Sequence, residues 1–174
     1  MQMTELPIAG AKLVCLNRFD DSRGSFAEAF RASWLNHGKQ WVQWNISRSC
    51  KGVLRGLHIH QRQTDYWHIV SGEATVAMVD NRPDSPSFRK AITVPLDAAN
   101  PQTLYIPAGI LHGFYANTDV ILMYLLDQEY DPVDEKGVRW DDLALGLPAS
   151  WYNLPSPILS PRDAQACLLK DLPI

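Results

Sequence analysis

Nine short apolar runs, each four to seven residues long and separated by turn residues, constrain the fold of this chain most strongly. Runs this short, rich in Val, Ile, Trp, Tyr and Phe, predict strands rather than helices. Turn signals such as Ser71-Gly72 and Asn100-Pro101 separate them. Nine strands at this spacing predict an all-β sandwich or barrel. The predicted strands are Ala11–Leu16, Trp41–Ser47, Val53–His58, Trp67–Val70, Ala74–Asp80, Phe88–Val94, Thr103–Ile106, His112–Ala116 and Val120–Leu126.

Helical segments are few. One is predicted around Ala27–Asn36, and another after Pro161, where proline in the first turn and Asp163 near the amino end are typical of a helix start. The 174 residues suffice for one domain with a sizeable core, so we expect a single domain over residues 1–174. From Asp131 onward the chain is richer in proline, and we expect this part to pack over the barrel.

Charge and cysteine content narrow the functional classes. The formal net charge of -3 argues against nucleic-acid binding, which needs a basic face, but a few arginines still suffice for an anionic small ligand. Cys15, Cys50 and Cys167 are odd in number and form no CxxC pair, so neither a disulfide framework nor a cysteine-based zinc site is expected. No run reaches the roughly 18 apolar residues of a membrane span. We therefore expect a cytoplasmic protein with no membrane partner.

The segment from Gly52 to His60 carries the densest chemical signal. Because side chains alternate along a strand, His58 and His60 are predicted to share one face, with Arg55 on the other. Gly56, on the predicted histidine face, would leave space for a ligand to approach the backbone. Two histidines two residues apart on one face favour a functional role over a structural one.

A second histidine signal follows a Pro-x-Gly turn. Residues 106–114 read IPAGILHGF and place His112 at the start of a predicted strand. Alone this pattern also fits a core histidine bonded to a carbonyl group. Together with the His58 segment it predicts a pocket lined by histidines.

At this point the sequence resembles the dTDP-4-dehydrorhamnose 3,5-epimerase family, a branch of the cupins. The resemblance implies a double-stranded β-helix, the jelly-roll barrel of the cupins, with a few short helices. Matching motifs recur in the family's order along most of the chain, which is far more specific than one motif. The segments are 21–30 (DSRGSFAEAF), 42–49 (VQWNISRS), 52–58 (GVLRGLH), 130–140 (YDPVDEKGVRW) and 158–163 (ILSPRD).

The resemblance implies epimerisation of a dTDP-4-dehydro-6-deoxyhexose, at C3, C5 or both, in deoxysugar or polysaccharide synthesis. His58 matches the general base, Asp163 the carboxylate that orients it, and Tyr130 the acid that returns a proton. No cofactor is expected, because the keto group of the substrate serves as the electron sink. The substrate-binding positions implied by the family are Arg23, Phe26, Glu28, Gln43, Asn45, Arg55, His60 and His112.

The resemblance also implies a homodimer that exchanges N-terminal strands, with some nucleotide-binding residues serving the neighbouring subunit's site. Two-fold dimers are the commonest oligomers in any case.

Two positions depart from the family pattern. His60 stands where the family usually has Gln, and Asp65 stands where it usually has the Lys that stabilises the enolate. A carboxylate that pointed into the pocket would oppose formation of an enolate. Either Arg62, His60 or His68 takes over the role of the cation, or the chemistry differs.

These departures keep two alternatives open. His58, His60, Asp65 and His112 resemble the ligand set of metal-binding cupins, and such residues suit Fe(II), Mn(II), Ni(II) or Zn(II). A non-catalytic homologue that binds sugar nucleotides is the other alternative. The set of His58, Asp163 and Tyr130 argues against it, because a binding module needs no acid–base pair.

Overall fold

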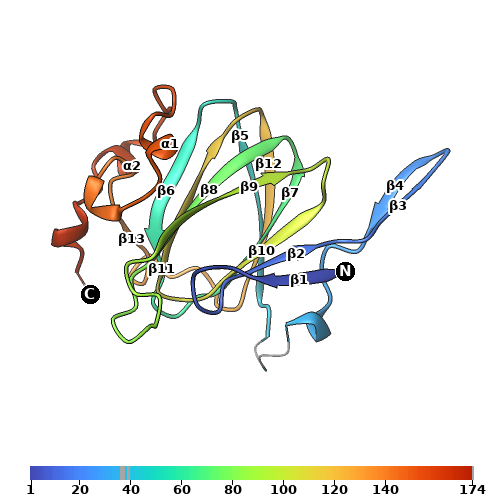
Figure 1. Cartoon of the computed structure of the whole chain (residues 1–174), viewed down its shortest axis with the longest axis horizontal. Helices are drawn as coiled ribbons and strands as arrows, with labels where there is room; N and C mark the ends of the chain where they lie inside the picture. Colours follow the sequence, from blue (N-terminus) through green and yellow to red (C-terminus); the bar gives the residue numbers. More distant parts are fainter. Residues whose placement is uncertain (36–37, 39, 174) are drawn as a thin grey trace.

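Two antiparallel sheets face each other in this computed structural model, which describes residues 1–35, 38 and 40–173 (Figure 1). The six-stranded sheet has the order β1 (Gln2–Glu5), β2 (Lys12–Cys15), β10 (Gln102–Ile106), β7 (Asp65–Ser71), β12 (Val120–Leu126) and β5 (Gln43–Ser49). The five-stranded sheet has the order β13 (Lys136–Gly137), β6 (Leu54–Ile59), β11 (Ile110–Ala116), β8 (Glu73–Asp80) and β9 (Ala91–Asp97). Strands distant in sequence pair side by side, and the predicted jelly-roll barrel is confirmed.

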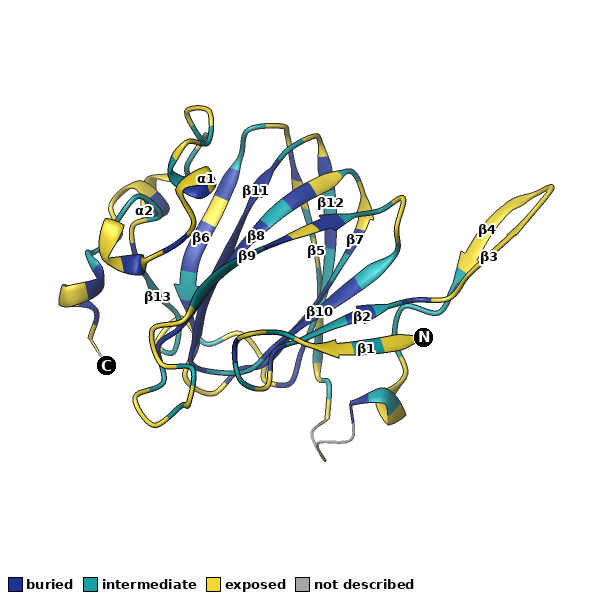
Figure 2. Cartoon of the chain, viewed as in Figure 1, coloured by how far each residue is buried: buried dark blue, intermediate teal, exposed yellow. Residues whose placement is uncertain are grey.

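Alternating side chains build the core between the sheets. On β8, Val76 and Met78 point into the barrel interior, where Leu104 and Leu122 of the opposite sheet meet them. The intervening Ala77 points outward, as the two-residue period of a strand requires. Apolar surface is thereby buried from both sheets (Figure 2).

The outer face of the five-stranded sheet is covered by the C-terminal part of the chain, as expected from its sequence. Trp151 and Leu145 pack against Leu54 and Leu57 in a second buried cluster. The covering segment contains η2 (Leu143–Leu145), α1 (Ala149–Tyr152), α2 (Pro161–Ala164) and η3 (Leu169–Asp171). The helix predicted after Pro161 is therefore confirmed as α2. This cover brings Asp163 to the barrel, which matters for the site below.

The helix predicted over Ala27–Asn36 is wrong for most of its length. Ala27 ends a strand, and only a single 3-10 turn, η1 (Ala32–Trp34), forms before the chain leaves the described residues at Asn36. Phe30 instead packs edge-on against Trp41 and Tyr66 on the outside of the six-stranded sheet. Contact with this aromatic cluster, rather than helical propensity, determines the local conformation.

The predicted strand Phe88–Val94 begins later than expected. β9 starts at Ala91, because Phe88 and Lys90 close turns with Ser85 and Ser87 and Arg89 has a φ of 65°. A positive φ in a residue other than glycine interrupts extended backbone.

A hairpin of β3 (Arg18–Asp21) and β4 (Gly24–Ala27) extends away from the barrel and is largely exposed (Figures 1 and 2). The nine predicted strands do not include it. In the part of the chain described, no helix combines the length and apolar character needed to span a membrane.

Candidate active site

A pocket of about 290 Å³ opens between the two sheets. Both sheets and the C-terminal cover supply its walls. Seven residues predicted from the sequence as site residues line it: Asn45, Arg55, His58, His60, His112, Tyr130 and Asp163. The fold therefore gathers side chains that are far apart in the sequence, from Asn45 to Asp163.

The dyad of His58 and Asp163 lies at one side of this pocket. His58 comes from β6, and its Nε2 atom is 2.7 Å from Oδ1 of Asp163 on α2. Both side chains are largely shielded, with exposed fractions of 24% and 7%. Burial acts to raise the pKa of Asp163, but the hydrogen bond from His58, the charge of His58 and the hydrogen bond from Ser160 outweigh it and hold the pKa below its usual value.

This pairing fixes the tautomer of the histidine. An ionised carboxylate only accepts hydrogen bonds, so Nε2 of His58 carries a proton and Nδ1 carries the lone pair. Ser160 caps α2, accepting from the backbone N–H of Asp163 and donating to its Oδ2 at 2.9 Å. The carboxylate is thus held on two sides, and His58 is poised to accept a proton at Nδ1.

Tyr130 reaches the pocket from the other sheet. It follows β12, its side chain is about half exposed, and its backbone N–H donates to Oε1 of Gln43 at 2.8 Å. Gln43 also donates to Asn45 from its Nε2 atom. Gln43, implied by the family as a substrate-binding residue, is not part of the pocket lining, but it holds Tyr130 and Asn45, which are.

Arg55 was predicted on the face opposite to His58, and that prediction is wrong. The pairing of β6 with β11 shifts register between His112 and Phe114, so that Arg55 and His58 both reach the pocket. Nε of Arg55 donates to Ser49 at 2.9 Å. A register irregularity of this kind redirects side chains that strict alternation would separate.

Gly56 serves this irregularity rather than the approach of a ligand. Its φ is +111°, and a Cβ atom there would lie 2.9 Å from both Cα of Gly113 and the carbonyl oxygen of His112. A Cβ atom on Gly113 would lie 2.5 Å from the carbonyl oxygen of Arg55. The two glycines allow the strands that carry the histidines to approach closely.

Glu135 and Ser47 are two of several pocket residues that were not assigned a role from the sequence. Glu135 forms an ion pair with Arg162, and its carboxylate oxygens lie 3.9 Å from Nδ1 of His58 and 3.9 Å from Nε2 of His60. The hydroxyl oxygen of Ser47 is buried and has no hydrogen-bond partner among the described residues. Ser47 is thus available to a bound ligand. Glu135 lies between the dyad of His58 and Asp163 and a second group of side chains that includes His60.

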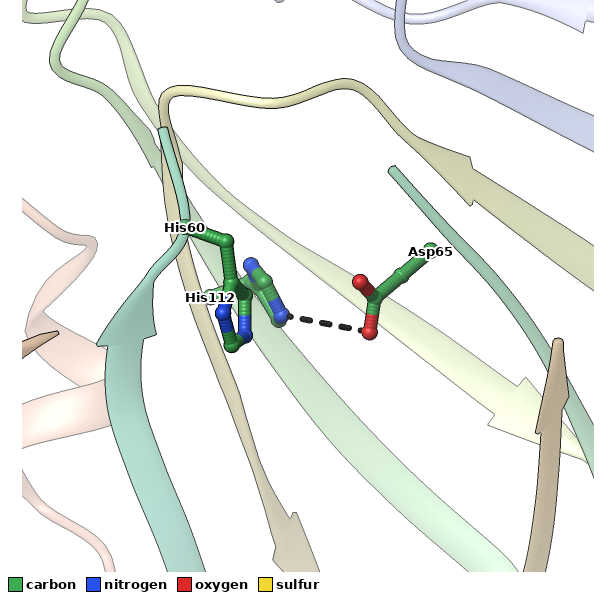
Figure 3. A group of neighbouring side chains, drawn as sticks. All are labelled: His60, Asp65 and His112. Atoms are coloured by element: carbon green, nitrogen blue, oxygen red, sulfur yellow. Dashed lines mark ion pairs between the residues drawn. The ribbon is translucent and has the colours of Figure 1, made fainter. Parts of the chain in front are cut away.

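His60, Asp65 and His112 form that group in the buried part of the pocket lining, here called its inner end. The two imidazole rings lie side by side and Asp65 faces them (Figure 3). One ligand atom from each lies within 4.8 Å of the others, and all three residues are buried. Of the four residues considered as metal ligands, these three converge. His58 is engaged with Asp163 instead, so the four-residue set does not form. Two histidines and a carboxylate are donors that suit a divalent transition metal.

Comparison with known proteins decides the family. The sequence profile of dTDP-4-dehydrorhamnose 3,5-epimerase matches residues 5–171. A protein of that name from Sinorhizobium fredii is 32% identical over 182 residues, covering 100% of this chain and 92% of its own length. The chain belongs to the dTDP-4-dehydrorhamnose 3,5-epimerase family. The predicted family and isomerase class are confirmed.

Solved structures of family members have the same fold as this chain. RmlC of Legionella pneumophila, in complex with dTDP-4-keto-L-rhamnose, superposes with a TM-score of 0.91 at 33% identity, covering 99% of this chain and 94% of that one. ChmJ of Streptomyces bikiniensis, a 3'-monoepimerase in complex with dTDP-quinovose, gives 0.89 at 33% identity, covering 97% and 88%. The 36% identical Neisseria gonorrhoeae protein of the family is longer, and this chain spans 51% of its length.

Of the three side chains considered as substitutes for the family's lysine, only His60 reaches the pocket. Arg62 is exposed and paired with Asp131 and Asp134, and Nδ1 of His68 faces the carbonyl oxygen of Gln102. Burial lowers the pKa of His60 to about 4, with the charge of His112 acting in the same direction. His60 is therefore neutral at neutral pH and supplies no positive charge.

The remaining substrate-binding residues implied by the family lie outside this pocket. Arg23 and Phe26 are on the exposed hairpin, where Arg23 pairs with Asp21. Glu28 follows the hairpin and pairs with Arg31. Within one chain, none of the three takes part in the lining of the pocket.

Proposed function

We propose that this family member epimerises a dTDP-4-dehydro-6-deoxyhexose at C3, C5 or both, using His58 as base and Tyr130 as acid. The observation that carries the proposal is the 2.7 Å contact between Nε2 of His58 and Oδ1 of Asp163 inside the pocket. Hydrogens next to a ketone are acidic, because the carbanion is delocalised onto the ketone oxygen. Nδ1 of His58 takes such a proton, and Asp163 and Glu135 stabilise the resulting imidazolium.

Return of a proton to the other face of the carbon inverts it. His58 belongs to the five-stranded sheet, whereas Tyr130 follows a strand of the six-stranded sheet, so the two line the pocket from different sheets. The phenol donates its proton to the face opposite His58. Arg55, Asn45 and Ser47 line the same pocket and supply polar groups for the hydroxyl and phosphate oxygens of the substrate. A non-catalytic homologue would need no such pair.

Proton exchange into the substrate tests the proposal directly. The protein is incubated in D2O with dTDP-4-keto-6-deoxyglucose, and deuterium at C3 and C5 is followed by NMR. We expect exchange at one or both carbons, and a loss of about 10²- to 10⁴-fold in His58→Ala. His68→Gln, on the outside of the six-stranded sheet, serves as the matched control and should retain the wild-type rate. Equal exchange rates in His58→Ala and wild type would contradict the role of His58.

A homodimer with exchanged N-terminal strands completes the site in this proposal. The edge strand β5 exposes Trp44 at 62% and Ile46 at 64%, and the projecting hairpin exposes Phe26 at 63%. An unpaired edge with apolar side chains favours association with another chain. In such a dimer the hairpin carries Arg23, Phe26 and Glu28 to the partner's pocket.

The mass in solution tests the dimer. Light scattering should give twice the chain mass at micromolar concentration, and Trp44→Asp should shift the protein toward the monomer. A wild-type monomer under these conditions would contradict shared sites. We further propose a single domain over residues 1–174 and a cytoplasmic location. The clusters shared by the barrel and its C-terminal cover support the first, and three free cysteines support the second.

A further inference from the structure

The group of His60, Asp65 and His112 contains a carboxylate where the proposed reaction would need a group that stabilises negative charge. An enolate needs a positive or hydrogen-bonding group at its oxygen. At this end of the pocket the titratable side chains are a buried carboxylate and two histidines, and among the described residues no lysine or arginine forms an ion pair with Asp65. The two arginines of the pocket lining, Arg55 and Arg162, are engaged with Ser49 and Glu135 instead. Asp65 itself is 3% exposed.

The hydrogen bond between His112 and a backbone carbonyl group leaves the other ring nitrogen of His112 facing the carboxylate of Asp65. Nδ1 lies 2.9 Å from the carbonyl oxygen of Ile110, so Nδ1 carries the proton. Nε2 then faces Oδ2 of Asp65 at 3.7 Å. An imidazole nitrogen and a carboxylate oxygen are both donors to divalent metal ions, so a single ion could be bound by Nε2 and Oδ2 together. Tetrahedral ligands about 2.0–2.2 Å from one ion lie about 3.4 Å apart, close to the observed separation.

Neighbouring side chains hold the carboxylate of Asp65 by hydrogen bonds, as residues around the ligands of metal sites commonly do. Oδ1 of Asp65 accepts from Nε2 of Gln63 at 2.8 Å, and Oδ2 accepts from Nε1 of Trp67 at 2.9 Å. Trp67 also packs edge-on against the ring of His112, with centroids 5.2 Å apart. Such outer contacts orient ligands and hold them ready. His60 lies beside His112, with ring centroids 5.6 Å apart.

We propose that His60, Asp65 and His112 bind one divalent transition metal ion at the inner end of the pocket. Three protein ligands leave coordination positions open to the substrate. Nitrogen donors disfavour Mg²⁺ and Ca²⁺, which prefer oxygen, and favour Zn²⁺, Mn²⁺ or Fe²⁺.

The catalytic part of the inference rests on the proposed function. His60, Asp65 and His112 would hold the ion, and a bound ion would act as a Lewis acid that stabilises negative charge on the ketone oxygen of the substrate. Nδ1 of His58 would take the proton from carbon, and the electron pair of the broken C–H bond would be delocalised onto that oxygen. His58 stays a free base, because its Nε2 is held by Asp163.

Metal binding is measured first, without substrate. The chelator-treated full-length protein is titrated by calorimetry with Zn²⁺ and Mn²⁺ separately, and bound metal is counted after dialysis. We expect one ion per chain and at least a 100-fold weaker affinity in Asp65→Asn and in His112→Gln, since even outer-shell changes cost 10- to 100-fold. His68→Gln should bind like wild type. Co²⁺ should give a visible d–d spectrum in wild type that both ligand variants lose.

The outcomes of these measurements test the metal site, its catalytic role and the proposed function separately. Failure of wild type to bind one equivalent of any of these ions, or unchanged binding in both ligand variants, overturns the site. Deuterium exchange at the same rate with chelator and with metal overturns only the catalytic role. One bound ion without exchange under either condition leaves the site standing and overturns the proposed function.

Discussion

Nε2 of His58 lies 2.7 Å from Oδ1 of Asp163, although 105 positions separate the two residues in the chain. One residue belongs to the barrel and the other to its C-terminal cover. Their contact therefore depends on the packing of Trp151 and Leu145 against the outer face of the five-stranded sheet. The chemistry of the pocket and the packing of the cover are thus linked.

Removal of the negative charge in Asp163→Asn should slow deuterium exchange by about 10²- to 10⁴-fold, because the amide neither holds the tautomer of His58 nor stabilises the imidazolium. The loss should appear in kcat with little change in KM. Asp171→Asn, an exposed carboxylate in the same cover, should leave both constants unchanged. A loss confined to KM would assign Asp163 to substrate binding instead.

Tyr130→Phe should separate exchange from inversion. His58 still removes the proton and returns deuterium to the same face, so we expect deuterium incorporation within about tenfold of wild type, with inversion slowed by about 10²-fold or more. The measurement is NMR of both deuterium content and ring stereochemistry on one sample. If exchange and inversion fall by the same factor, Tyr130 shapes the pocket rather than donating the proton.

Gly56→Ala should destabilise the barrel through overpacking between β6 and β11. The new Cβ would meet backbone atoms of Gly113 and His112 at 2.9 Å, and such overpacking costs about 1–3 kcal/mol in addition to the unfavourable φ. Gly146→Ala is the matched control: its φ is +68° and nothing lies within 4 Å of the added atom, so only the backbone cost of about 1–2 kcal/mol remains. Urea unfolding measures both, and equal losses would contradict the packing argument.

Asp80→Asn should reveal a buried charged network at the end of β8. Burial acts to raise the pKa of Asp80, but hydrogen bonds from Arg82, Ser85 and Ser87 outweigh it and hold the pKa well below its usual value. The free energy of unfolding at pH 7 should fall by about 1.5–3 kcal/mol, the typical contribution of a hydrogen bond to a charged group.

The pH dependence of that loss has a definite sign. A depressed folded-state pKa stabilises the protein above the unfolded-state value near 3.9, and this contribution disappears as the pH falls toward the folded-state value. The difference between wild type and Asp80→Asn should therefore be constant from pH 7 to 5 and shrink below about pH 4. Asp141→Asn, whose exposed partner Arg139 is also two residues away, should cost less than about 1 kcal/mol at any pH.

The sequence predicted the strands of the barrel well where the apolar pattern was uninterrupted. Val120–Leu126 was predicted to the residue, and the other predicted strands deviate from their observed bounds by no more than about three residues, as is usual for element ends. The hairpin of β3 and β4 was missed because exposed polar residues such as Asp20 and Ser25 hide its alternation. A strand that packs against no hydrophobic core shows little alternation of apolar and polar residues in its sequence.

The candidate site was predictable as a set of residues, but not in its geometry. Resemblance to the family identified His58, Asp163 and Tyr130, whereas alternation alone placed Arg55 on the wrong face, since a register shift does not show in composition. Resemblance to the ligand set of metal-binding cupins had grouped Asp65 with His112, whereas the distance between the two side chains depends on the pairing of distant strands. Glu135 belongs to one of the segments that match the family, but only the folded structure shows that it lies between His58 and His60.

The position of Asp163 on the covering segment has a consequence for biosynthesis. A ribosome that has delivered the chain as far as β12 has already released every strand of the six-stranded sheet and four of the five in the other. Such a nascent chain carries His58 without its carboxylate. In the proposed mechanism, His58 is therefore oriented by its carboxylate only after translation has passed α2.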